Sequence, residues 1–191
     1  PRGAVVVAFP EGRAARAKTY DHRYRLARFE AKDLVVAALE AGFSQVQSSL
    51  GVAYFNAREF EKSEAPLTRA LAEQPQDAGL KRMLAIACVN TQAWEKAAAL
   101  LQDDPGRETD PALELAYGLA LLRSRRSAEA EKVFTGLLTR RGDSAELSLL
   151  LGQAQAAQDR LDAAVASLRR AVELNPAAEE ARAALGAALV R

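Results

Sequence analysis

Cysteine and histidine are nearly absent from the sequence, which contains one of each among its 191 residues. The lone Cys88 excludes an internal disulfide and a cysteine-rich metal cluster, and the lone His22 excludes a zinc site built from several histidines. Glycine and proline are also scarce, at 11 and 7 residues, whereas an all-β fold needs many turn residues and β-branched strands. The sequence therefore predicts a fold without disulfides, metal sites or sheets.

A large charge excess and a long apolar run are also missing. The formal net charge is +1, which gives no whole-chain attraction to nucleic acid or anionic lipid. No apolar run approaches the ~18 residues that indicate a transmembrane helix. We expect a soluble protein of the bacterial cytoplasm or periplasm, with no nucleic-acid partner and no membrane insertion.

Motifs for catalysis or cofactor binding are missing as well. The sequence contains no glycine-rich phosphate loop, HExxH or nucleophile-elbow motif. His22 lies between Asp21 and Arg23 and is interpreted as a solvated surface residue, while Cys88 is interpreted as a buried structural thiol. The acidic residues of 103–110 lack the spacing of a calcium loop and are expected to be solvated. We predict neither an enzyme nor a cofactor.

Alanine and leucine dominate what is present, with 42 and 26 residues, and both are strong helix formers. Small residues recur at intervals of 34, 33, 34 and 34, and a second small column follows twelve residues after each of the first four. Large residues precede the first column, and other large residues follow the second. The two small columns consist of Gly51, Ala85, Gly118, Gly152 and Gly186, and of Ser63, Ala97, Ala130 and Ala164. Such a period is typical of helical repeats, whose helix axes approach closely only where side chains are small.

Each unit is predicted to contain two helices. In the last full unit, the apolar residues of 145–158 and of 161–174 follow helical spacing, and Pro176 ends the second helix. We divide the array into units 44–77, 78–110, 111–144 and 145–178, followed by a capping helix at 179–191. The second helix of unit 78–110 is expected to be short, because 103–106 reads Asp-Asp-Pro-Gly and leaves a loop to about Asp110.

These columns resemble the tetratricopeptide repeat (TPR) family over about residues 44–191. The family pattern is Leu-Gly and Tyr in the first helix, then Ala, Phe or Leu, Ala and a closing Pro in the second. The first unit matches it well at Leu50, Gly51, Tyr54, Ser63, Leu67, Ala70 and Pro75. The fourth unit matches it well at Leu151, Gly152, Ala164, Leu168, Ala171 and Pro176. The middle units depart from it: Asp104 stands where a small residue is expected, and Gly142 replaces the closing Pro. The resemblance implies an all-α fold, an α-α superhelix that forms a right-handed solenoid of antiparallel helix pairs.

The first 43 residues are different. Residues 1–10 read as an extended apolar tail, since Val5–Val7 and Phe9 precede or flank Pro10. Residues 11–43 are predicted to be helical, either as one long capping helix or as a degenerate repeat, with an amphipathic seam that includes Tyr20, Tyr24 and Leu34.

The family resemblance also implies a concave groove lined by the first helices. Its positions here are Ser48, Val52, Phe55, Asn56, Arg82, Ile86, Val89, Asn90, Leu115, Leu119, Leu122, Arg123, Leu149, Gln153 and Ala156. A family subtype that clamps a C-terminal carboxylate needs Lys, Asn and Arg, and the matching positions, among them Val52 and Ala116, do not fit it. The apolar centre instead predicts a protein or peptide partner, with self-association through tail 3–10 as one possibility. The alternative is a structural spacer in which curvature covers the groove.

Overall fold

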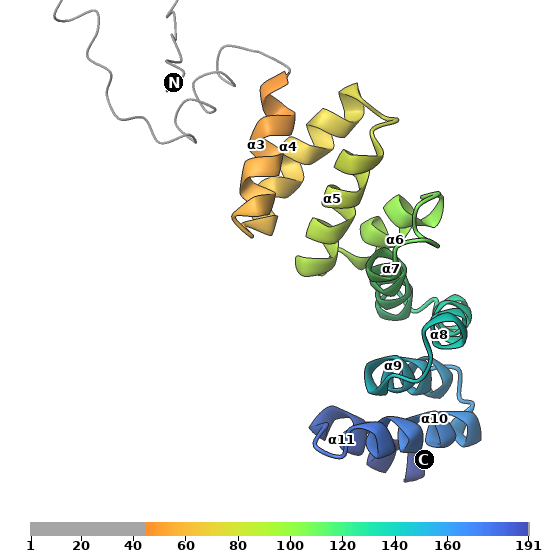
Figure 1. The fold of residues 1–191 in the computed structure, drawn as a ribbon. Coiled ribbons are helices and arrows are strands. Elements are labelled where there is room, and N and C mark those ends of the chain that lie inside the picture. The colour runs from red at the N-terminus through yellow and green to blue at the C-terminus, as the bar shows by residue number, and fades with distance from the viewer. Residues whose placement is uncertain (1–44, 191) are drawn as a thin grey trace, which may run out of the picture.

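A computed structural model describes residues 45–190, and nine α-helices follow one another within them (Figure 1). First helices alternate with second helices along the chain. The first helices are α3 (Gln45–Asn56), α5 (Ala78–Asn90), α7 (Pro111–Arg123), α9 (Ala145–Ala156) and α11 (Glu179–Leu189). The second helices are α4 (Phe60–Glu73), α6 (Trp94–Gln102), α8 (Ser127–Arg141) and α10 (Leu161–Leu174).

Each helix packs on the helix that follows it, in sequential antiparallel pairs. The all-α solenoid predicted from the sequence is therefore confirmed. Every pair falls within one of the units 44–77, 78–110, 111–144 and 145–178, although the unit boundaries themselves remain our proposal. The predicted tail 1–10, the segment 11–43 and His22 lie outside the described residues.

The turns inside the four pairs repeat one backbone conformation. A non-glycine residue with positive φ ends each turn, at Arg58, Gln92, Arg125 and Asp159, with φ of 60–63°. These residues are separated by intervals of 34, 33 and 34, the period of the sequence. Left-handed backbone in residues with a Cβ is uncommon, so its recurrence at one register position shows that the four units share a turn geometry.

Capping residues mark the starts of the first helices α5 and α7. Asp77 accepts a hydrogen bond from the Leu80 amide at 3.0 Å, and Asp110 accepts one from the Ala112 amide at 2.9 Å. Pro111 occupies the start of α7, where its missing N–H costs nothing. These caps satisfy amides that the helices leave unpaired.

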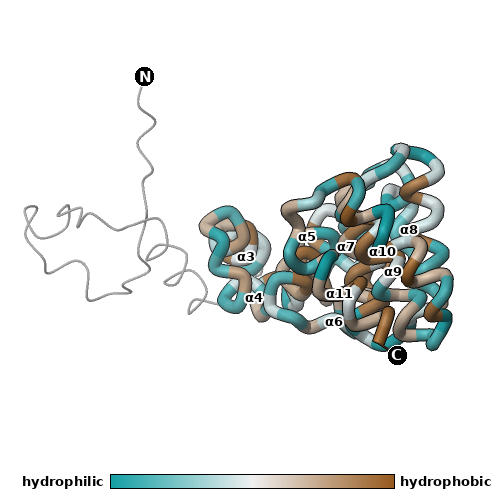
Figure 2. Tube along the Cα trace, turned by 90° about the horizontal axis from the view of Figure 1, so that it is seen from below, coloured by the Kyte–Doolittle hydropathy of each residue, from teal (hydrophilic) through white to brown (hydrophobic). Residues whose placement is uncertain are grey.

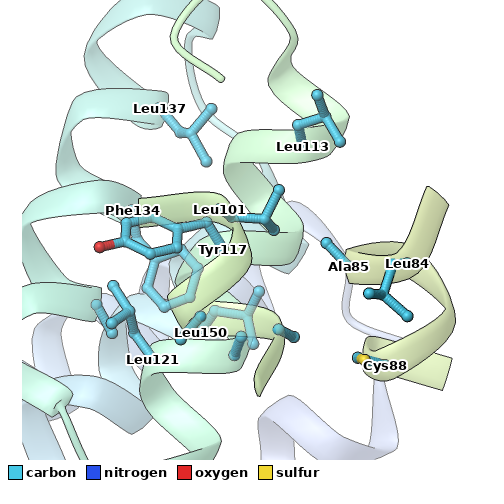
Figure 3. Close-up of a cluster of buried hydrophobic side chains, with 14 of the residues drawn as sticks. Leu84, Ala85, Cys88, Leu101, Leu113, Tyr117, Leu121, Phe134, Leu137 and Leu150 are labelled. Atoms are coloured by element: carbon cyan, nitrogen blue, oxygen red, sulfur yellow. The ribbon is translucent and has the colours of Figure 1, made fainter. Parts of the chain in front are cut away.

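The core lies between the two layers of helices. Leu67, Leu101, Phe134 and Leu168, one from each second helix, are at most 1% exposed. Figure 3 shows Leu101, Tyr117, Leu121, Phe134 and Leu150 gathered in one cluster of buried side chains. Figure 2 shows hydrophobic and hydrophilic stretches interleaved along the array. Helices α4, α6 and α10 separate the two kinds of residue most clearly onto opposite sides, as expected for helices that bury one side.

Three of the column glycines allow the paired helices to approach. A Cβ built on Gly51, Gly118 or Gly152 would lie 2.7, 2.6 or 2.6 Å from Leu67, Phe134 or Leu168, respectively. The same role expected for Gly186 is wrong, because nothing lies within 4 Å of a Cβ there. No described helix crosses that side of α11.

The second unit has the short closing helix that the sequence predicted. Helix α6 ends at Gln102, and the loop that follows runs to Asp110. Asp104 is not solvated as expected but 4% exposed. Its carboxylate accepts two hydrogen bonds from the Arg82 guanidinium, both at 2.8 Å, and one from the Gly106 amide. Asp104 therefore departs from the repeat pattern because an ion pair replaces a small packed residue.

Helix α11 packs on α10 and α9, but Leu189 and Val190 at its end are 57% and 89% exposed. Its role as a cap remains a prediction. Within residues 45–190, no helix is long and apolar enough to cross a membrane.

Candidate binding groove

All predicted groove positions lie on first helices. The eight larger apolar members share one degree of burial, neither fully buried nor fully exposed, and they are Val52, Phe55, Ile86, Val89, Leu115, Leu119, Leu122 and Leu149. Six of the eight pack against the buried core, while Phe55 stacks edge-on against Phe60 at 5.6 Å between ring centroids. The face therefore keeps apolar surface in contact with solvent and has rigid support behind it.

Two polar members of the predicted set are already engaged within the chain. The Arg82 guanidinium holds the Asp104 carboxylate, and the Asn90 side-chain amide donates to the Ile86 carbonyl at 2.8 Å. Arg82 lowers the pKa of Asp104 by this hydrogen bond, so the pair is held charged. We conclude that the main role of Arg82 is to hold the α6–α7 loop of its own unit through Asp104.

The structure brings four predicted positions together at one end of the row. Leu122 and Arg123 of α7 and Gln153 and Ala156 of α9 line one hollow. Residues of α10 and α11, together with Ala157 at the C-cap of α9, complete the hollow, and sequence reasoning missed them. Those of α10 and α11 are Leu168, Ala184, Ala187 and Ala188. Carrying the groove register one unit further would have pointed to α11, since Ala187 lies 34 residues after Gln153.

In the part of the chain that the structure describes, no cluster of three His, Cys, Asp or Glu residues could hold a metal ion. Cys88 is fully buried as predicted, and burial raises its pKa to about 11. A thiol with so high a pKa is a poor nucleophile at neutral pH.

Antiparallel helix pairs at a period of 33–34 residues, with a solvent-accessible apolar face on the first helices, define a helical-repeat solenoid. The tetratricopeptide repeat pattern matches residues 49–107 and 115–179, more than half of the chain. The chain belongs to the tetratricopeptide repeat family. Members of this family are typically protein-interaction scaffolds and generally lack enzymatic activity.

Solved structures share the fold. MamA residues 41-end from Desulfovibrio magneticus RS-1 align with a TM-score of 0.66 and 18% identity, covering 78% of this chain and 84% of that one. MamA AMB-1 aligns at 0.60 with 24% identity, over 71% and 81%. YrrB, described as a TPR protein with an unusual peptide-binding site, aligns at 0.66 with 18% identity, over 77% and 76%. None of the curated proteins matches the sequence.

Proposed function

We propose that this chain is an interaction scaffold whose first-helix groove binds an apolar peptide or helix of a partner protein. The observation that carries the proposal is the row of half-buried apolar side chains on α3, α5, α7 and α9. Outside this row, the exposed large hydrophobic residues of the described chain are confined to the C-terminal end, at Leu174, Leu189 and Val190. The row runs over four successive first helices.

An apolar helix suits this surface for a physical reason. Six of the eight side chains of the row already pack on the core, so binding loses little of their conformational freedom. Burying one aliphatic side chain supplies roughly 1.5–3 kcal/mol when burial is complete, and several such contacts are available. YrrB, with the same fold, is described as binding a peptide, which supports a peptide as the class of partner.

A matched pair of variants tests the proposal. Leu119→Gln places an amide in the middle of the row, whereas Leu174→Gln makes the same exchange on second helix α10. The probe is a fluorescein-labelled amphipathic peptide with leucines along one face, followed by fluorescence anisotropy. Leu119→Gln should weaken binding about five- to tenfold, or ~1–1.4 kcal/mol, and Leu174→Gln should leave it unchanged.

Thermal melts verify that both variants remain folded. Equal binding by the two variants would contradict a groove site. If the wild-type chain binds no such peptide, the alternative of a structural spacer without its own ligand is the better account.

A further inference from the structure

The hollow at the end of the groove, between α7, α9 and α11, has a volume of about 370 Å³. Its floor is the fully packed Leu168 of α10, and most of its wall is alanine. Figure 1 shows α9, α10 and α11 stacked at the C-terminal end of the array, where this hollow lies. It is continuous with the groove because Leu122, Gln153 and Ala156 belong to both.

The repeat register explains why a hollow forms at this place. Ala156 of α9 occupies the position that Leu122 has in α7, and Ala184 of α11 occupies the position of Leu150 in α9. Each pair is separated by 34 residues, so corresponding side chains point the same way. At the equivalent place one repeat earlier these two positions hold leucines, whereas here they hold alanines. The missing volume is therefore specified by residue choice and not by a distortion of the helices.

Two polar groups face this alanine-lined space. Arg123 is the one charged residue in the lining; it is exposed and makes no ion pair or hydrogen bond within residues 45–190. Gln153, the other polar residue of the lining, is engaged within the chain, because its side-chain N–H donates to Glu180 at 3.0 Å.

We infer that this hollow is the anchor subsite of the groove and selects a partner segment in which an apolar side chain carries a carboxylate beside it. The apolar side chain fills the space left by Ala156 and Ala184. The carboxylate pairs with Arg123. The inference rests on the proposed function and names the chemistry of the partner.

Two matched peptides test the charge. Both are fluorescein-labelled amphipathic helices on the order of 15 residues, the length at which helices become marginally stable, with leucines on one face. One carries glutamates beside the leucines, and the other carries glutamines. Fluorescence anisotropy with the wild-type chain should give the acidic peptide about three- to fivefold tighter binding, the range of an exposed ion pair, and the difference should shrink at high salt.

Variants assign the effect to the hollow. Arg123→Gln should abolish the preference for the acidic peptide, whereas Arg169→Gln, which removes an exposed charge from α10, should preserve it. Ala156→Leu installs the residue that the preceding unit already accommodates, and it should weaken both peptides tenfold or more by filling the hollow. A melting curve shows whether Ala156→Leu is folded, and the Arg123 comparison does not depend on it.

The inference is overturned if the wild-type chain binds both peptides equally, or if a folded Ala156→Leu chain binds as the wild type does. Loss of binding in Leu119→Gln under those results would leave the groove function standing while the anchor subsite fails. Absence of binding by either peptide to the wild-type chain would overturn both.

Discussion

At the scale of single residues, the effect of a glycine on helix packing depends on its place in the array. A Cβ on Gly152 would lie 2.6 Å from the Leu168 branch carbon and 3.2 Å from the Ala164 carbonyl, whereas a Cβ on Gly186 would meet nothing within 4 Å. Overpacking costs ~1–3 kcal/mol, and alanine gains up to ~1 kcal/mol over glycine in a helix. We therefore expect Gly152→Ala to destabilise the chain and Gly186→Ala to stabilise it.

Urea denaturation measures both changes, and the free energies of unfolding should differ by at least ~1 kcal/mol between the two variants. Equal values would show that the glycine column has no role in helix approach.

The buried carboxylate of Asp104 makes a second prediction at this scale. Because Arg82 lowers the pKa of Asp104, the unfolded chain binds more protons at acidic pH than the folded chain does. The stability contributed by the pair is complete above the unfolded pKa of ~3.9 and is lost as pH falls through the lower folded pKa. Asp104→Asn should lower Tm at pH 7, with a deficit that narrows below about pH 4.

The matched control for this pH series is Asp103→Asn, because Asp103 is exposed and forms no ion pair in residues 45–190. Thermal melts of the two variants and the wild type across the pH range measure the Tm deficit of each variant. A deficit of Asp104→Asn that stays constant with pH would contradict the ion pair.

Contacts between neighbouring units hold the array together at the scale of helices. Glu131 of α8 accepts hydrogen bonds from Gln158 at 2.8 Å, from Gln155 at 3.3 Å and from Arg160 at 2.6 Å. Burial alone raises the pKa of Glu131, but these hydrogen bonds lower it overall. Glu64 occupies the corresponding position in α4 and contacts Thr91 and Lys96 of the next unit. The same acid thus links two of the unit junctions.

Glu131→Ala should reduce the free energy of unfolding by ~1.5–3 kcal/mol, the contribution of a hydrogen bond to a charged group. Hydrogen exchange should accelerate in α9 and α10, since repeats are stabilised by their nearest neighbours. Glu129→Ala is the control, because its ion pair with Arg126 lies within one turn and both side chains are exposed. Uniform acceleration over all helices would argue against a local junction.

Helix positions were the part of this molecule that the sequence predicted best, because the repeat period, the small columns and the helix-ending Pro176 agreed. The α6 break was predicted from Asp103–Gly106, since Pro and Gly act locally. The burial of Asp104 was missed because its partner Arg82 lies 22 residues earlier. The left-handed turns at Arg58 and Gln92 were missed because neither residue is a glycine or asparagine, the usual signal for positive φ.

At the scale of the whole molecule, the arrangement of first and second helices determines which surface is available to a partner. The first helices present an apolar face, whereas the second helices α8 and α10 expose charged side chains. The residues that the family resemblance assigns to the groove lie on first helices, and their role in binding stays a prediction. The hollow was not predicted, because it depends on α11 and on alanines whose importance appears only by comparison with Leu122 and Leu150. A small residue in the sequence does not indicate whether the space beside it is filled or empty.

The central claim is that the first-helix face binds an apolar segment, and NMR of the ¹⁵N-labelled chain tests it most directly. Adding the unlabelled leucine-faced acidic peptide should shift the amide resonances around Ile86, Leu119 and Leu122 on α5 and α7, and around Gln153 and Ala187 at the hollow. Resonances around the exposed Leu174 on α10 should stay in place. Shifts that cluster on α4, α8 and α10, with α5 and α7 unchanged at saturation, would contradict the account.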